Sequence, residues 1–153
     1  MEILTGSKPL REKIRILERK LGMLNDLQSS CCGVTLAQCH TIVEIGRIGS
    51  LSLNDLADLL GLDKSTMSRT VDKLVADGVA LRETDQDDRR YIQIRLTAKG
   101  LKIYEGIEET MNLYFNRIFS LIPEDKRENL LESLDLLIQA FVHNECSLNC
   151  MED

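Results

Sequence analysis

The fold is decided by residues 51–100, which read LSLNDLADLLGLDKSTMSRTVDKLVADGVALRETDQDDRRYIQIRLTAKG. The first half of this stretch contains two short helical patterns, which are joined by a turn at Gly61. The second half contains two alternating strand patterns with a charged loop between them. Helix, turn, helix and hairpin in this order predict a winged helix-turn-helix.

The first helix of the pair has a clear start signal. Ser52 is placed as its N-cap and Asp55 follows three residues later, so that side chains can satisfy the amides of the first turn. One narrow apolar stripe then recurs at helical spacing and consists of Leu53, Leu56, Ala57 and Leu60. Gly61 supplies the turn, and Asp63 is placed to cap the second helix.

The second helix is expected from Lys64 to Asp77. Its inward positions are Met67, Val71, Leu74 and Val75. Its outward positions are Lys64, Ser65, Thr66, Ser68, Arg69, Asp72 and Lys73. Short hydroxyl side chains and a basic residue in the first two turns suit a helix end that enters the major groove, where Arg grips guanine or phosphate. The alternative is the solvated face of an ordinary surface helix.

The hairpin that follows favours the DNA interpretation. Gly78 ends the helix, and residues 80–83 are expected to pair with residues 91–96. The intervening loop, residues 84–90, is too polar to pack. An Arg beside an Asp at such a tip suits a wing, because the carboxylate can hold the guanidinium rigid while it reaches into a narrow minor groove.

These residues resemble the MarR family of bacterial and archaeal transcriptional regulators. The matching features are Leu53-x-Asp55-Leu56-Ala57, Ser65-Thr66 with Ser68-Arg69, Leu74 followed by Gly78, and Asp88-Arg89-Arg90 followed by Ile94-x-Leu96-Thr97-x-x-Gly100. The last group looks like that family's wing signature D-x-R…L-T-x-x-G and is the most specific. The resemblance implies that Asp88 orients Arg90 for the minor groove and that Arg89 is a second candidate for a phosphate contact.

Nine residues are therefore the expected DNA contacts. They are Lys64, Ser65, Thr66, Ser68, Arg69, Lys73, Asp88, Arg89 and Arg90. The net charge of the chain is −6, but residues 62–102 hold nine Lys or Arg against seven Asp or Glu, which leaves +2 there and −8 elsewhere. Phosphate contact therefore has to be local and should weaken with salt.

Helical patterns flank the winged stretch. One runs from Leu10 to Leu27, and residues 28–34 read as a turn-like connection. Thr35 and Gln38 form a capping box for a helix that should run to about Ile45, and glycines at 46 and 49 bracket the link to Leu51. After the wing, a helix is expected from residue 98 to about 121 and another from Pro123 onward.

The last helix is apolar on nearly two sides, which indicates burial by a second chain. We expect a mainly α (α+β) fold in which residues 1–47 and 98–153 form a helical dimerisation domain and residues 48–97 the DNA-binding domain. The resemblance implies a homodimer whose outer helices intertwine, and two-fold symmetry implies a pseudo-palindromic operator on double-stranded DNA. The alternative is a monomeric bundle whose helices cover each other.

Five cysteines exceed what packing requires: Cys31, Cys32, Cys39, Cys146 and Cys150. The pattern places the first two in a loop near a helix N-terminus, where a lowered thiol pKa favours sensing of oxidants or electrophiles. Alternatively, several thiolates converge on a soft metal or metalloid ion. The remaining interpretation is structural, with Cys39 as a small buried hydrophobe and the last two cysteines on a frayed tail.

Other classes of function remain open from the sequence. A MarR-like repressor could be released by a small aromatic ligand, with structural cysteines. A thiol peroxidase or reductase would use Cys31 or Cys32, but no C-x-x-C or phosphate loop accompanies them, so we expect no enzyme. A purely structural dimer is a third class. Without an apolar membrane span or a leader pattern, a cytoplasmic protein with no membrane partner is expected.

Overall fold

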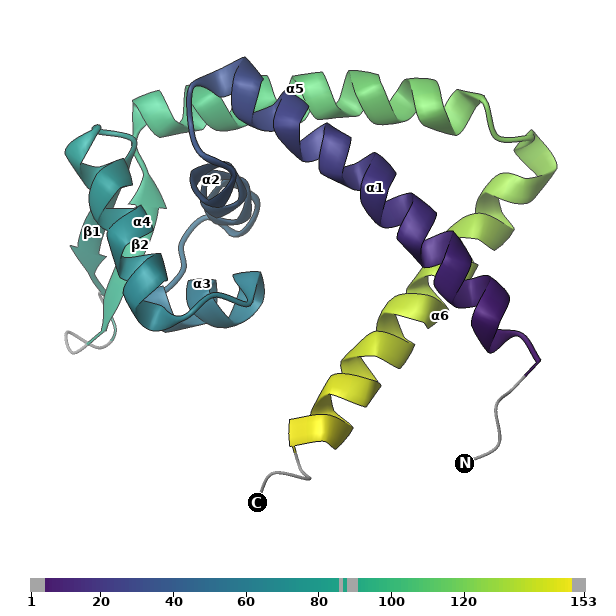
Figure 1. The fold of residues 1–153 in the computed structure, drawn as a ribbon. Helices are drawn as coiled ribbons and strands as arrows, with labels where there is room; N and C mark the ends of the chain where they lie inside the picture. Colours follow the sequence, from purple (N-terminus) through teal and green to yellow (C-terminus); the bar gives the residue numbers. More distant parts are fainter. Residues whose placement is uncertain (1–4, 86, 88–90, 150–153) are drawn as a thin grey trace. The chain divides into compact units, whose positions relative to one another are not determined.

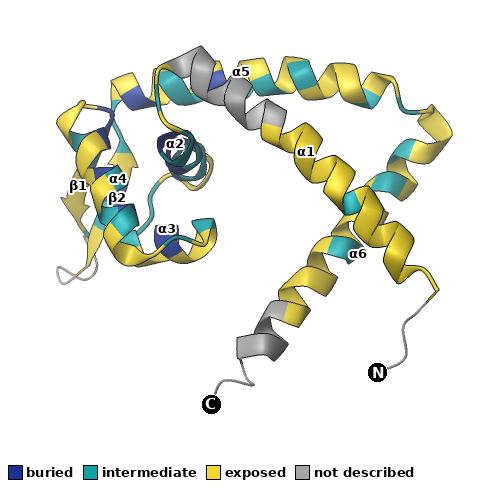
Figure 2. Cartoon of the chain, viewed as in Figure 1, coloured by how far each residue is buried: buried dark blue, intermediate teal, exposed yellow. Residues whose placement is uncertain are grey.

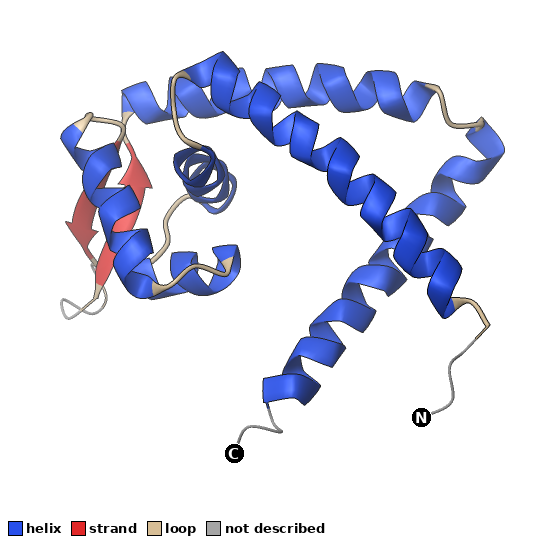
Figure 3. Cartoon of the chain, viewed as in Figure 1, coloured by secondary structure: helices blue, strands red, loops and turns tan. Residues whose placement is uncertain are grey.

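The computed structural model of this chain describes residues 5–85, 87 and 91–149, and for residues 23–32 and 145–149 it describes the backbone alone. Within this part of the chain there are six helices and one antiparallel sheet of two strands (Figures 1 and 3). In order they are α1 (Ser7–Cys32), α2 (Leu36–Ile48), α3 (Leu53–Leu60), α4 (Lys64–Ala76), β1 (Ala80–Thr84), β2 (Ile92–Leu96), α5 (Ala98–Ser120) and α6 (Glu124–Asn149). The predicted mainly helical winged fold is confirmed.

The helix-turn-helix forms as its caps predict. The Ser52 hydroxyl accepts a hydrogen bond from the Asp55 amide at 3.1 Å, which starts α3. Gly61 ends α3 with a positive φ of 62°, a conformation that other residues rarely adopt. Asp63 then caps α4 by accepting from the Thr66 amide at 2.8 Å. Local signals therefore fix both helix starts and the turn between them.

The core lies among α2, α3, α4 and the sheet, where Figure 2 shows the buried residues. Its largest fully buried side chains are Ile42, Ile45, Leu56, Met67, Val71, Leu74 and Ile94. Because α4 contributes three of them, its inner face is held firmly while its outer face stays exposed. In the described part of the chain, no helix is both long and apolar enough to cross a bilayer.

The wing has a partner that the sequence did not reveal. β1 and β2 pair in the register Ala80 with Leu96 and Thr84 with Ile92. In addition, Leu51 forms an isolated antiparallel bridge with Ile94, through hydrogen bonds of 3.2 and 2.8 Å. A single bridging residue leaves no alternating pattern, so periodicity could not predict it. The bridge ties the segment before α3 to the wing.

The predicted turn at residues 28–34 is wrong for most of its length. α1 continues through these positions to Cys32, and the stop signal is Gly33, whose φ is +66°. Serine is a weak helix former but not a breaker, so the residues before Gly33 do not end the helix. Cys31 and Cys32 therefore lie at the C-terminal end of α1 rather than in a loop at a helix N-terminus.

Gly46 is also placed differently from the prediction. It lies inside α2, which runs to Ile48 and ends at Gly49. A Cβ at Gly46 would meet the Tyr104 ring at 2.5 Å, so the missing side chain allows the ring on α5 to sit against the backbone of α2. The glycine is there for close packing and not to link two elements.

The contacts divide the chain into residues 1–109 and residues 110–153. The second unit holds the end of α5 and all of α6, and none of its described side chains, residues 110–144, is buried. Within it, the Arg127 guanidinium lies 5.3 Å from the centre of the Phe119 ring and donates to the Ile122 carbonyl at 3.1 Å. The predicted division into residues 48–97 and the flanking helices stays a prediction.

α5 starts against the turn that follows α4. The Thr97 hydroxyl donates to the Gly78 carbonyl at 2.6 Å and accepts from the Gly100 amide at 3.1 Å. A Cβ at Gly100 would lie 2.1 Å from the Val79 carbonyl oxygen. The T-x-x-G part of the wing pattern therefore joins the turn between α4 and β1 to the start of α5.

Replacing Gly100 with Ala should destabilise the protein by about 1 to 3 kcal/mol, because the backbone at Val79 must move to admit the Cβ. The matched control is Gly106→Ala, since a Cβ there meets nothing within 4 Å. This control should stabilise α5 by about 0.5 to 1 kcal/mol. Chemical denaturation of the two variants measures both changes, and equal effects would contradict the close contact at Gly100.

Candidate nucleic-acid interface

The N-terminal end of α4 carries a connected set of polar side chains. The Ser65 and Thr66 hydroxyls both donate to the carboxylate of Asp63, at 2.5 and 2.6 Å. Hydrogen bonds from the Ser65 side chain, then the Thr66 side chain and amide, hold the pKa of the Asp63 carboxyl well below its usual range. Asp63 is therefore ionised at neutral pH, and the three side chains form a hydrogen-bonded cluster in which Asp63 and Ser65 are exposed and Thr66 is half-buried.

Arg69 lies back along the same face of α4. Its Nε donates to the Ser65 carbonyl at 3.3 Å, and its Nη2 lies 3.5 Å from the Ser65 hydroxyl. Lys64 is exposed beside this cluster, whereas Ser68 is half-buried. The guanidinium is thus held one turn from the helix start, over the positions at which a recognition helix contacts base edges.

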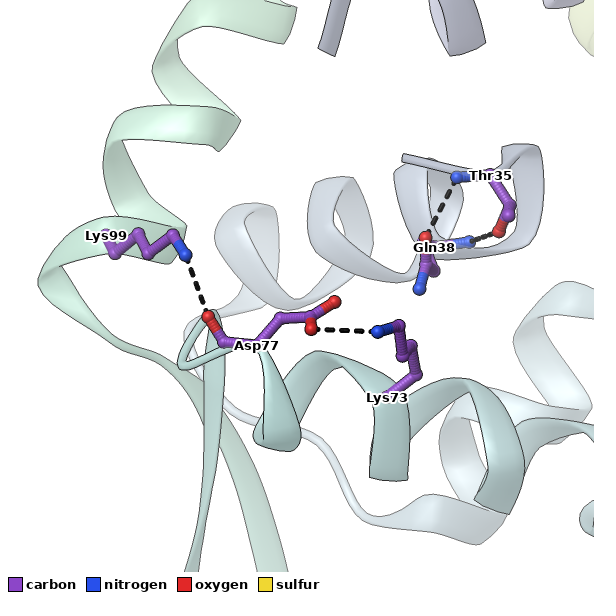
Figure 4. Close-up of polar contacts among 5 residues, drawn as sticks. All are labelled: Thr35, Gln38, Lys73, Asp77 and Lys99. Carbon is purple, nitrogen blue, oxygen red and sulfur yellow. Dashed lines mark hydrogen bonds and ion pairs between the residues drawn. The ribbon is translucent and has the colours of Figure 1, made fainter. Parts of the chain in front are cut away.

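Lys73 lies two turns into α4 and is paired differently. Its ammonium forms an ion pair with Asp77 at 3.0 Å, while Lys99 of α5 donates to the Asp77 backbone carbonyl at 2.8 Å (Figure 4). The Lys73 side chain remains 62% exposed, so its charge is available to phosphate at little cost. An ammonium is a point charge and lacks the paired donors of a guanidinium, so Lys73 suits a phosphate contact better than base readout.

An ion pair connects the wing to the recognition helix. Nη2 of Arg82, in β1, lies 2.5 Å from a carboxylate oxygen of Asp72 on the outer face of α4. On the hairpin itself, Arg95 pairs with Glu83 of the opposite strand at 3.3 Å. Asp72 therefore joins two elements that are ten residues apart and orients the base of the wing relative to α4. The sequence predicts Asp72 only as an outward position of the helix, and its pairing with Arg82 leaves no local signal.

Near the tip of the wing, the structure describes residues up to 85, residue 87 and residues from 91 onward. The Asp85 amide donates to the Tyr91 carbonyl at 2.8 Å, and the Asp85 carboxylate accepts from the Asp87 amide and the Gln93 side chain. Asp85 therefore closes the hairpin just beyond its last paired residues. The predicted minor-groove and phosphate contacts, Asp88, Arg89 and Arg90, lie outside the described residues.

Of the five cysteines, only Cys39 has its side chain in the described part of the structure. Cys39 lies in α2 and is fully buried, which agrees with the packing interpretation. The side chains of Cys31, Cys32 and Cys146 and the whole of Cys150 lie outside what is described. Among the described residues, no group of three or more His, Cys, Asp or Glu side chains could hold a metal ion. The soft-ion hypothesis therefore depends entirely on the four other cysteines.

The position of Cys31 and Cys32 corrects the electrostatic argument made from sequence. A helix N-terminus lowers a thiol pKa, but both residues belong to the last turn of α1, where the carbonyl ends carry partial negative charge. The next helix start is at Thr35, whose side chain and amide exchange hydrogen bonds with Gln38 at 3.3 and 2.9 Å (Figure 4). This capping box is confirmed as predicted.

Comparison with known proteins finds relatives among transcriptional regulators. A family model described as "MarR family" matches residues 33–90. The chain is similar to YfiV of Bacillus subtilis, an uncharacterised HTH-type transcriptional regulator, with 25% identity over 107 residues that cover 70% of this chain and 67% of the relative.

Two solved structures share the fold. A MarR transcriptional regulator from Methanosarcina mazei has a TM-score of 0.74 at 23% identity, covering 90% of this chain and 99% of that one. A mutant of MarR from E. coli, solved in complex with operator DNA, has a TM-score of 0.69 at 22% identity and covers 89% and 99% of the two chains.

The cross-element pair gives a test of wing orientation. Asp72→Asn should release Arg82 and speed amide hydrogen exchange in β1 and β2 about two- to fivefold, because an exposed ion pair contributes a fraction of a kcal/mol to about 1 kcal/mol. The matched control, Asp77→Asn, breaks the Lys73 pair within one helix and should leave wing exchange unchanged. Exchange followed by NMR decides, and equal protection in both variants would contradict the orienting contact.

Proposed function

Because this chain belongs to the MarR family of transcriptional regulators, we propose that it is a homodimeric repressor which binds an inverted-repeat operator and is released by a thiol-directed signal. The single observation that carries the DNA-binding part is the start of α4. There, ordered hydroxyls and an arginine are exposed on a helix whose other face is locked into the core. The DNA complex of the similar E. coli protein supports the same use of the fold.

The proposed contacts divide into two kinds. Ser65, Thr66, Ser68 and Arg69 face base edges in the major groove, and Arg90, oriented by Asp88, enters the minor groove. Lys64, Lys73 and Arg89 contact phosphate. Since the ion pairs of Lys73, Arg82 and Arg95 offset part of the local positive charge, base contacts have to supply much of the preference for the operator.

The exposed apolar side chains of the second unit support dimerisation. Between residues 113 and 142 they are Leu113, Phe115, Ile118, Leu121, Leu131, Leu134, Leu136, Ile138, Phe141 and Val142. Leu121, between α5 and α6, is 85% exposed in the single chain, and Leu136 of α6 is 67% exposed, so burying this unit against a second copy would stabilise it. Two-fold pairing through these helices would present two α4 helices to successive major grooves.

The proposed release signal acts on Cys31 and Cys32. They end α1 only a few residues before the capping box that starts α2, so a group added there would lie at a helix junction. Peroxide would oxidise a thiolate by two electrons to a sulfenic acid and leave hydroxide. A soft metal or metalloid would instead bind thiolates, with Cys146 and Cys150 as further candidate ligands. Because DNA is the partner, we place the protein in the cytoplasm.

Arg69→Ala should relax base preference and cost about 1 to 3 kcal/mol on the preferred duplex, whereas Lys73→Ala should weaken all duplexes alike. The preferred duplex comes from selection in a random library with the unaltered protein and should be an inverted repeat. Fluorescence anisotropy measures the affinity of each variant for this duplex and for a scrambled one. Equal losses on both duplexes after Arg69→Ala would contradict base readout.

The release signal is tested on the same duplex. Peroxide, Zn(II), Cu(I) or arsenite should release the unaltered protein, and Cys31→Ser with Cys32→Ser should abolish the response. Cys39→Ser is the control, because a fully buried thiol should not report on added reagents. Release by salicylate-like aromatics alone would favour the small-ligand alternative, and catalytic turnover of peroxide would favour an enzyme.

A further inference from the structure

The carboxylate of Asp63 is occupied on both oxygens by the side chains that follow it. Oδ1 accepts from the Ser65 hydroxyl at 2.5 Å and from the Thr66 amide at 2.8 Å, and Oδ2 accepts from the Thr66 hydroxyl at 2.6 Å. All three side chains lie at the start of α4, where Asp63 and Ser65 are exposed and Thr66 is half-buried. An ordinary N-cap needs only the amide bond. The two hydroxyl bonds are additional and call for an explanation.

The direction of these bonds is fixed by chemistry. An ionised carboxylate only accepts hydrogen bonds, and each hydroxyl has a single proton to donate. The protons of Ser65 and Thr66 are therefore both directed at Asp63. What remains toward solvent is lone pairs, and one lone pair of Ser65 faces the Arg69 guanidinium at 3.5 Å.

We propose that Asp63 determines base specificity by turning Ser65 and Thr66 into hydrogen-bond acceptors only. In the major groove, the donors are the N6 amino group of adenine and the N4 amino group of cytosine. The two hydroxyls would then read amino groups and reject guanine O6, thymine O4 and phosphate oxygens, which all require a donor. A serine or threonine without such a carboxylate adapts to either kind of partner.

Arg69 complements this arrangement. Its guanidinium only donates, so it pairs with the acceptors N7 and O6 of guanine. The exposed face of α4 would thus present acceptors in its first turn and a donor one turn later. The inference rests on the proposed function, because it requires α4 to enter the major groove. It adds the class of base edge that each position recognises.

The test deletes single groups from the DNA, so that the unaltered protein is itself informative. In the duplex selected from a random library, each adenine is replaced by purine and each cytosine by 2-pyrimidinone, which removes one amino group at a time. At the contacted positions the unaltered protein should lose about tenfold in affinity. Ser65→Ala or Thr66→Val should show no further loss on the same analogue.

Asp63→Asn supplies the complementary measurement. An amide keeps one oxygen acceptor and offers donors, so at least one hydroxyl is released from its fixed role. Repeating the selection with this variant should admit guanine or thymine at a position where the unaltered protein demands adenine or cytosine. The matched control is Asp55→Asn at α3, where the Ser52 hydroxyl also donates to a carboxylate, at 2.6 Å, and base preference should not change.

Two results would overturn this inference alone. In one, Ser65→Ala and Thr66→Val cause no further loss of affinity on duplexes with 7-deazaguanine or 7-deazaadenine, which lack the N7 acceptor. On the analogues that lack an amino group, the same variants still lose affinity. In the other, both variants weaken all duplexes equally, as phosphate contacts would. Failure of the unaltered protein to select any duplex at low salt would instead overturn the proposed function, and this inference with it.

Discussion

The close contact between the Val79 carbonyl and the backbone at Gly100 holds together the parts that would touch DNA. It places the first turn of α5 directly on the turn between α4 and β1, and the Thr97 hydroxyl secures it through the Gly78 carbonyl. Lys99 adds a bond to the Asp77 carbonyl. Residues 77–79 are thus joined to residues 97–100, where the end of α4, the base of the wing and the start of α5 meet. A displacement of α5 at this end would therefore be transmitted to the end of α4.

Charge at the interface is arranged for orientation more than for attraction. Asp72 uses its carboxylate to hold Arg82 of the wing, and Asp77 holds Lys73 on the helix. Exposed pairs of this kind add little to stability. Their cost is a smaller net positive charge, which weakens nonspecific binding to phosphate. Because the overall charge is −6, selectivity in the proposed DNA complex would depend on where these few cations are held.

The sequence predicted features that depend on neighbouring residues and missed those that depend on residues far apart in the chain. Helix caps at Ser52, Asp63 and Thr35 are local, so both helices of the pair and the start of α2 were found. Contacts between distant segments were missed, including the bridge from Leu51 to Ile94 and the ring of Tyr104 against Gly46. The predicted end of α1 is wrong because serine is a weak helix former that does not stop a helix, which continues to Cys32. A residue's partner across the fold leaves no periodic trace in the chain.

These long-range contacts also indicate where a signal could enter. Cys39 is sealed in the core, and reaching it requires local unfolding, which would cost much of the stability of the winged unit. The end of α1 is followed directly by Gly33 and then by the capping box of α2. α2 in turn lies on Tyr104 of α5 through Gly46. The junction of α1 and α2 is thus connected, through α5, to the contact at Gly100 that positions the recognition helix.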